Sequence, residues 1–369
     1  MGLIRTFHPV GQGAFYTERH SFEKDFFTVV YDCGSATLNK QELERKVKST
    51  FLKNETIDIL FISHFHADHI NGIDILKNHC DIKAVVLPLM HNRCKILIKV
   101  DNFVNGFNDT LLIDDPQSYF GENVKIIYIR ERDDDEQRPI DNNIDVDIFI
   151  SELTERREFN SGTKFKISNN FDWVFIPFNY KYDTYSKTFE DALSRHRLTL
   201  SDIDTIRKMS TRKNKAILKA YKSANSNLNE TSMVLFSGKM DSDEIFFYNC
   251  YPRIFVKAHF FSSYIGCLYM GDVNLRRKNI ISDLKNALGN FMDYVGTIQI
   301  PHHGSIDNFD NSILTENIRN AIFSYGTNNT YGHPSDKVIA ESLANLTYPY
   351  FVTEKQTSIV IQVTQNKPM

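Results

Sequence analysis

The stretch Ile57–His69 reads IDILFISHFHADH and decides the fold. Five of its first six residues are apolar, which is typical of a buried β-strand. Three imidazoles and a carboxylate follow within six residues, His64 to His69. Loops after the carboxyl ends of strands build the sites of α/β folds, so we expect a site here. Imidazole binds Zn, Fe, Ni and Cu, and the added carboxylate admits Mn. The alternative is a surface loop that is merely rich in histidine.

Strands and helices alternate on both sides of this stretch. Residues 26–31 and 84–88 predict buried strands, and residues 39–53 and 73–79 predict helices. This rhythm favours an α/β layered fold. It lapses over 100–228, and strands are expected again at 232–237, 244–250, 265–270, 296–300, 320–325 and 357–363. We therefore expect one domain over residues 1–369, with 100–228 as an insertion or cap within it.

The composition is that of a globular protein and excludes several classes. The 369 residues are 41% hydrophobic and 24% charged, which excludes a disordered or fibrous chain. No apolar run approaches the roughly 18 residues of a membrane helix, and no signal peptide opens the chain. The five cysteines are scattered without CxxC pairs, so a reducing, cytoplasmic location is expected. A net charge of −3 means that any contact with nucleic acid must come from a local basic patch.

Further short motifs accompany the histidine stretch in a fixed order. They are VGQG (10–13), DCG (32–34), SH (63–64), NETS (229–232), MGD (270–272), PHHGS (301–305) and YGHP (331–334). With HxHxDH at 64–69, the series resembles the metallo-β-lactamase superfamily. Within it, the series is similar to the hydrolase domain of ComEC-type DNA-uptake proteins and its free-standing relatives. The resemblance covers residues 1–95 and 229–365, and implies a four-layer αββα sandwich with a two-metal site on its edge.

The resemblance also implies a role for each matching residue. The first metal would be bound by His64 and His66, the second by Asp68, His69 and His303, and Asp272 would bridge the two. Asp68 is also expected to act in catalysis. Supporting positions around the ligands are implied for Asp32, Ser63 and His302, because ligating histidines need partners that fix their rings.

One departure from the family pattern concerns the first metal. Where the superfamily offers a third histidine, this chain has Asn229. An amide oxygen is a poor ligand for Zn and a better one for a harder ion. We expect two divalent ions, with zinc the first expectation and manganese the alternative. His91 and His196 are the other candidates for the missing ligand.

A basic stretch, 207–222, leads towards Asn229 and contains no acidic residue. Its interpretation as a phosphate-binding surface names Arg207, Lys208, Arg212, Lys213, Lys215 and Lys219. The competing interpretation is the solvated face of a cap helix. The acidic run at 133–136 is expected to be a solvated loop.

These observations predict a metal-dependent hydrolase, a phosphodiesterase or nuclease that uses a metal-bridging hydroxide. The expected partner is a nucleic-acid or nucleotide phosphodiester, with no membrane contact. His333 lies in a rigid Gly-His-Pro turn and is expected to hydrogen-bond a phosphate oxygen or protonate the leaving oxygen. The alternatives are a small-molecule hydrolase (a cyclic-nucleotide or phosphocholine-type diesterase, a lactonase or a β-lactamase) and a non-catalytic binding module.

Overall fold

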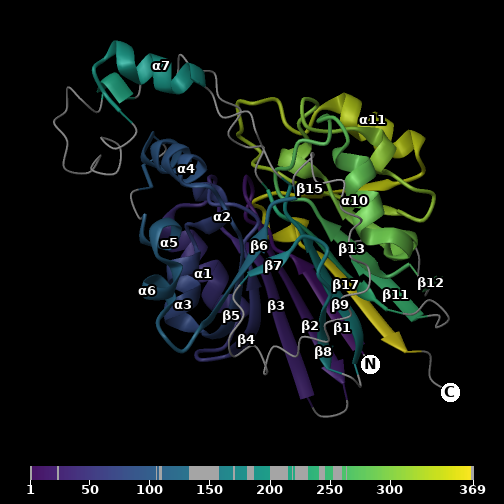
Figure 1. The fold of residues 1–369 in the computed structure, drawn as a ribbon. Helices are drawn as coiled ribbons and strands as arrows, with labels where there is room; N and C mark the ends of the chain where they lie inside the picture. Colours follow the sequence, from purple (N-terminus) through teal and green to yellow (C-terminus); the bar gives the residue numbers. More distant parts are fainter. Residues whose placement is uncertain are drawn as a thin grey trace.

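Two β-sheets lie face to face between two layers of helices in the computed structural model (Figure 1). The described residues are 2–22, 25–104, 106–107, 110–132, 158–168, 171–180, 187–199, 215–217, 219–220, 232–240, 246–251, 260–262 and 264–366. The arrangement confirms the predicted four-layer αββα sandwich. Among the described residues, no helix is both long and apolar enough to cross a membrane.

Among the described residues, the first sheet has ten strands, seven from residues 2–160 and three from residues 246–366. In spatial order they are β12 (Phe260–Ser262), β11 (Phe246–Tyr251), β17 (Val360–Asn366), β1 (Gly2–Phe7), β2 (Phe15–Phe22), β3 (Asp25–Cys33), β4 (Thr56–Phe61), β5 (Asp81–Pro88), β6 (Lys125–Arg130) and β7 (Glu158–Asn160). Strands β3 to β7 are parallel neighbours, whereas β1 pairs antiparallel with both β2 and β17. The sheet therefore has a parallel half, where helices connect the strands, and an antiparallel half.

The second sheet has seven strands. They are β16 (Tyr348–Val352), β15 (Asn320–Ser324), β14 (Val295–Gln299), β13 (Gly266–Tyr269), β10 (Val234–Lys239), β9 (Phe171–Phe178) and β8 (Phe165–Ser168). Strands β13 to β16 are parallel, so their carboxyl ends reach one edge of the sheet.

The helices cover the outer faces of the two sheets (Figure 1). On the first sheet they are α1 (Lys40–Thr50), α2 (Ala67–Ile70), α3 (Ile73–His79), α4 (Asn92–Val104), α5 (Leu111–Asp114) and α6 (Pro116–Phe120). On the second they are α10 (Ile280–Leu288) and α11 (Asp336–Ala344), while α7 (Lys187–Arg195) stands beyond α4. Helix α1 begins with a capping box, in which Asn39 and Glu42 satisfy each other's backbone N–H groups.

The predicted lapse of the α/β rhythm at residue 100 is wrong for part of the segment. Strands β6 and β7 extend the first sheet in parallel, and β8 and β9 extend the second. The described part of 125–180 thus belongs to the sandwich itself. The insertion stays a prediction for 181–228, of which only 187–199, 215–217 and 219–220 are described.

A buried charge network joins the two sheets. Glu18 of β2 accepts hydrogen bonds from Arg5 Nε at 2.6 Å, Ser237 Oγ at 2.7 Å and Tyr269 OH at 2.8 Å. Arg5 and Glu18 are fully buried, and such ions are tolerated inside a protein only when they are paired. Because Tyr269 ends β13, this network fixes the strand that leads to Asp272.

Candidate metal centre

Five chain segments meet at the edge where the parallel strands of both sheets end. Asp32 lies at the end of β3, and the stretch His64–His69 follows β4. From the second sheet, Asp272 follows β13 and the turn Pro301–Gly304 follows β14. His333 follows β15. The parallel order of these strands is what brings the motifs together.

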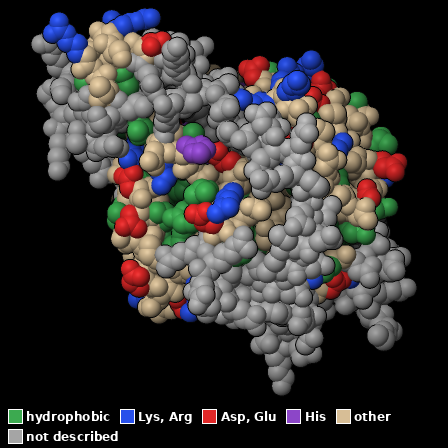
Figure 2. All heavy atoms as spheres, in the orientation of Figure 1, with side chains coloured by type: hydrophobic (Ala, Val, Ile, Leu, Met, Phe, Trp, Pro, Cys, Tyr) green, Lys and Arg blue, Asp and Glu red, His purple; other side chains and the backbone are tan. Residues whose placement is uncertain are grey.

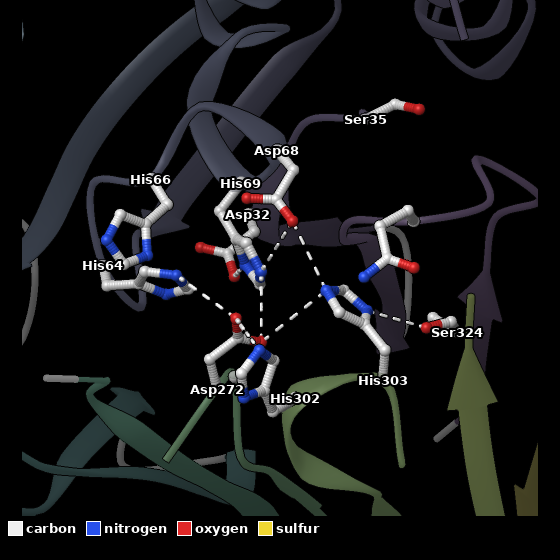
Figure 3. Close-up of polar contacts among 12 residues, drawn as sticks. Asp32, Ser35, His64, His66, Asp68, His69, Asp272, His302, His303 and Ser324 are labelled. Atoms are coloured by element: carbon white, nitrogen blue, oxygen red, sulfur yellow. Dashed lines mark hydrogen bonds and ion pairs between the residues drawn. The ribbon is translucent and has the colours of Figure 1, made fainter. Parts of the chain in front are cut away.

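Asp272 occupies the centre of the site (Figure 3). Its Oδ2 lies 3.7 Å from Nε2 of His64, whereas its Oδ1 lies 3.4 Å from Nε2 of His69 and 3.9 Å from Nε2 of His303. Each carboxylate oxygen therefore faces a different histidine. His64, His69 and Asp272 form one group of ligand atoms within 4.8 Å of one another.

A second group of donors shares His69 with the first. It consists of Asp68, His69 and His303, whose ligand atoms also lie within 4.8 Å of one another. Oδ2 of Asp68 is 3.3 Å from Nε2 of His303 and 4.0 Å from Nε2 of His69. The two adjacent donor groups share His69, and the carboxylate of Asp272 lies close to members of both. This arrangement suits a pair of ions.

Asp32 fixes the orientation of the His69 ring. Its carboxylate accepts hydrogen bonds from His69 Nδ1 at 2.8 Å, from Ser63 Oγ at 2.6 Å and from Ser63 N at 2.7 Å. A carboxylate only accepts, so Nδ1 of His69 carries the proton and Nε2 presents its lone pair to the centre. Asp32 is fully buried with φ at +55°, a strained conformation that functional sites often store.

His64 and His303 are oriented in the same way. Nδ1 of His303 donates to the carbonyl of Ser324 at 2.8 Å. Nδ1 of His64 lies 2.9 Å from Ser63 Oγ and 3.0 Å from Ser232 Oγ. Ser63 already donates to Asp32, so its oxygen accepts from His64 and the His64 lone pair also sits on Nε2.

The atoms that face the centre fit a bound cation. Nε2 of His64, His66 and His69 and Oδ1 of Asp272 are buried with no hydrogen-bond partner. Buried polar atoms are otherwise almost always satisfied, so a ligand is expected. Imidazole nitrogens with carboxylate oxygens are the donor set of Zn, Mn and Fe.

Burial and nearby charges shift the pKa values of two histidines of the centre in opposite directions. Burial opposes protonation, yet the carboxylates of Asp272 and Asp68 raise the pKa of His69 well above its ordinary value. Burial, reinforced by the charge of His69, lowers the pKa of His64 well below its ordinary value. Because metal ligands must be deprotonated, the metal affinity of this centre is expected to depend on pH.

Two glycines explain why the VGQG and DCG motifs accompany the histidines. A Cβ at Gly13, whose φ is +135°, would clash with the carbonyl oxygen of Asp68. A Cβ at Gly34 would meet the same oxygen. The backbones of the VGQG and DCG loops thus pack directly against the backbone of the His64–His69 loop and support Asp68 and His69.

The turn that carries His303 is strained. His302 and His303 have φ values of +46° and +57°, a conformation that costs on the order of 1–3 kcal/mol per residue. A hydrogen bond of 3.0 Å from His302 N to the carbonyl of Gly271 holds the turn against the Asp272 loop. Gln299 supports that loop, since its Oε1 accepts from the backbone N–H of Gly271 at 2.8 Å.

His333 lies at the rim of the centre. Its ring is 5.6 Å from that of His302 and is stacked on Tyr331 at 6.1 Å. The side chain of His302 in turn lies 4.0 Å from Asp272, so His333 is one ring removed from the centre. Burial lowers the pKa of His333 to about 4, and the ring is therefore neutral at neutral pH.

A family comparison agrees with this geometry. The model of the metallo-β-lactamase superfamily matches residues 24–147, which include Asp32 and the whole stretch His64–His69. Over this part of the chain the sequence is similar to the metallo-β-lactamase superfamily. Members of this superfamily are in general hydrolytic metalloenzymes. The matched region ends before Asp272 and His303, which the fold supplies from the second sheet. No curated protein matches the sequence significantly.

Three solved structures show a distant likeness. The metallo-β-lactamase fold protein YhfI from Bacillus subtilis is 9% identical at a TM-score of 0.39, covering 98% of this chain and 99% of that one. A diphosphatase of the PhnP family is 10% identical at 0.35, covering 95% and 86%. A long-form RNase Z from yeast is 12% identical at 0.32, covering 97% and 41%. Likeness at this level indicates no substrate for this protein.

The remaining predicted site residues fall in several places. His91 is exposed and lies 3.4 Å from Glu131, and His196 is exposed, so neither joins the donor groups. Lys215 and Lys219 are exposed at the end of the basic stretch. The predicted residues Asn229, Arg207, Lys208, Arg212 and Lys213 lie outside the described residues.

Asp101, Ser232 and Gln299 lie around the centre, and the sequence assigned no role to them. His66 belongs to neither donor group within the described part of the chain, and its Nε2 lies instead 3.8 Å from Oδ2 of Asp101 in α4. Ser232 Oγ accepts from the backbone N–H of Asp272 at 2.8 Å while contacting His64. The sequence did contain a sign of the role of Gln299, because a single amide between Ile298 and Ile300 is unusual at the end of a buried strand. It contained no such sign for Asp101.

Proposed function

We propose that this protein is a two-metal hydrolase of phosphodiester bonds, with a nucleic acid or a nucleotide as its substrate. The observation that carries the proposal is Asp272, whose two oxygens face His64 on one side and His69 and His303 on the other. The facing nitrogens of His64 and His69 are buried without partners. A carboxylate between two imidazole sets suits a pair of ions about 3.5–4 Å apart.

We assign the ligands of each ion as the motif series implies, and the two donor groups support most of this assignment. His64 and His66 would bind the first ion, Asp68, His69 and His303 the second, and Asp272 both. Zinc suits the imidazole-rich set, and manganese is the alternative because of the carboxylates. When bound, the ions supply a lowered pKa for water and neutralise charge that develops on phosphate oxygens.

The chain's own groups complete the chemistry. Asp32 and Ser63 keep the ligand lone pairs aimed at the centre, which removes reorganisation during the reaction. Asp68 is 19% exposed against 4% for Asp272, so Asp68 meets and orients the incoming water. The neutral ring of His333 donates a hydrogen bond to a phosphate oxygen at the rim.

Basic charge next to α4 supports a phosphodiester over a lactam or a thioester. Ile217 and Ala220 pack against Leu97 and Val100 of α4 in a small core, which places the exposed lysines of this segment next to α4. Figure 2 shows Lys and Arg side chains gathered at the end of the molecule that carries α7. The ComEC-like order of motifs supports the same substrate class. All five cysteines are free, which suits the cytoplasm as its location.

Metal analysis combined with a substrate panel tests the proposal. The purified protein is loaded with Zn²⁺ or Mn²⁺ and assayed on single- and double-stranded DNA, RNA, cyclic nucleotides and a chromogenic lactam. We expect two ions per chain and turnover of a phosphodiester, and we expect Asp272→Ala to lose both metal and turnover while unfolding at a similar temperature. Hydrolysis of the lactam alone, or a chain that binds no metal, would contradict the proposal.

A further inference from the structure

His66 faces a carboxylate that no motif includes. Its side chain is 5% exposed, its Nε2 has no hydrogen-bond partner, and Oδ2 of Asp101 lies 3.8 Å away. That separation is too long for a hydrogen bond. Two ligands of one tetrahedral zinc ion, with bonds of about 2.0–2.2 Å, lie about 3.3–3.5 Å apart. The gap between His66 and Asp101 is thus close to that between two ligands of one ion.

The same spacing recurs at the other donor pairs of the centre. His64 Nε2 and Asp272 Oδ2 are 3.7 Å apart, and His303 Nε2 and Asp68 Oδ2 are 3.3 Å apart. The pair of His66 and Asp101 therefore resembles the donor pairs already placed in the site, and differs from a surface ion pair because His66 is buried.

A hydrogen bond next to this pair fixes α4 on the metal-binding loop. Nδ2 of Asn102 donates to the carbonyl of Phe65 at 2.7 Å, and both groups are buried. Phe65 stands between the two histidines of the first ion, so this contact sets the distance from α4 to both rings. Asp101 is the adjacent residue of α4 and is held by the same contact.

We propose that Asp101 is a ligand of the first metal and completes the set of His64, His66 and Asp272. This inference rests on the proposed two-metal function and adds a ligand from α4. Two imidazoles and two carboxylates form a harder donor set than three imidazoles and one carboxylate. The first site therefore accepts Mn²⁺ more readily than an imidazole-rich site does.

Metal affinities of four variants test the assignment. Asp101→Ala removes the ligand, Asp101→His replaces it with an imidazole, and Asp114→Ala is the matched control, since Asp114 pairs with Lys99 of α4 away from His66. Asn229→Ala tests the ligand that the family pattern suggested. The probes are Zn²⁺, Mn²⁺ and Co²⁺ alone, followed by calorimetry, by metal content per chain and by the visible spectrum of the Co²⁺ form.

We expect Asp101→Ala to keep one tight ion and to bind the other more than about 100-fold more weakly, beyond the loss typical of an outer-shell partner. Asp101→His should restore Zn²⁺ but not Mn²⁺, with a changed Co²⁺ spectrum, and Asp114→Ala should match the parent. Unchanged affinities in a folded Asp101→Ala, or loss of the first ion in Asn229→Ala only, would overturn the assignment. Because these readouts need no substrate, they stand even where no phosphodiester is hydrolysed.

Discussion

Replacing Asp32 by Asn separates the orientation of a ligand from its presence. Asn tolerates the positive φ of this position, so the backbone should persist. The amide oxygen can still accept from Ser63 N, but the amide NH₂ then faces Ser63 Oγ and His69 Nδ1, which both donated to the carboxylate. His69 can accept from that NH₂ only by moving its proton to Nε2, where the proton blocks metal binding.

The expected cost follows from these contacts. Partners that orient a ligating histidine are typically worth about 10- to 100-fold in metal affinity, or about 1.4–2.7 kcal/mol. The loss should fall mainly on the second ion, which His69 serves, because His64 keeps Ser232 as a hydrogen-bond partner. Competition with a chromophoric chelator measures the two dissociation constants separately.

Asp58→Asn is the matched control for this change. Asp58 also accepts a backbone hydrogen bond, from Thr28 N at 2.7 Å, but lies in β4 away from the centre. It should leave both dissociation constants unchanged. Equal weakening of both ions in Asp32→Asn, or none, would refute the argument that Asp32 acts through the His69 ring.

Three further perturbations address the rim, the cap and the core. His333→Ala should lower turnover by at least about tenfold with both ions retained. His333→Gln should keep most of the turnover, because the neutral ring acts as a hydrogen-bond donor and an amide can replace it. Equal loss of turnover in both variants would favour proton transfer by His333. Lys215→Glu with Lys219→Glu should weaken a nucleic-acid substrate and reduce the salt slope of log K by about 0.9 per phosphate contact, as measured by binding titrations; an unchanged slope returns the segment to a solvated helix face. Glu18→Gln should lower the free energy of unfolding in urea at neutral pH by about 3–5 kcal/mol, because the buried guanidinium of Arg5 loses its charged partner. The surface change Glu55→Gln should lower it by only about 0–1 kcal/mol. Burial alone would raise the pKa of Glu18, yet the Arg5 guanidinium holds that pKa below its usual range. The stabilising contribution of ionised Glu18 is therefore present above about pH 4 and is lost as the pH falls further. An unfolding free energy of the parent that is flat from about pH 7 to pH 2 would contradict this.

The first donor stretch was predictable because its signal is local. Six residues after a strand carry four ligand-type side chains, and the periodicity of the flanking segments identifies the layer that holds them. Asp272 and His303 are more than 200 residues further on, so only the ordered series of motifs connected them to it. Their approach depends on the parallel order of β13, β14 and β15, which no single segment encodes.

Strand β16 escaped prediction for a different reason. Its sequence, YPYFV, contains Pro349, which cannot donate to a ladder and counts against a strand. The structure tolerates it because β16 is the edge strand of the second sheet and pairs only with β15 among the described strands. Position in the sheet, not local propensity, decides this element.

Helix α4 was hidden because it is buried on two sides. Ile98 packs into the core beneath the first sheet, whereas Leu97 and Val100 pack into the small core with α7, Ile217 and Ala220. A helix between two cores has no single apolar face, so it shows no clear helical period. The same two-sided packing makes α4 the element at which the sandwich, the basic segment and Asp101 meet. Under the proposed function, this helix would hold the basic segment and the first metal at a fixed separation.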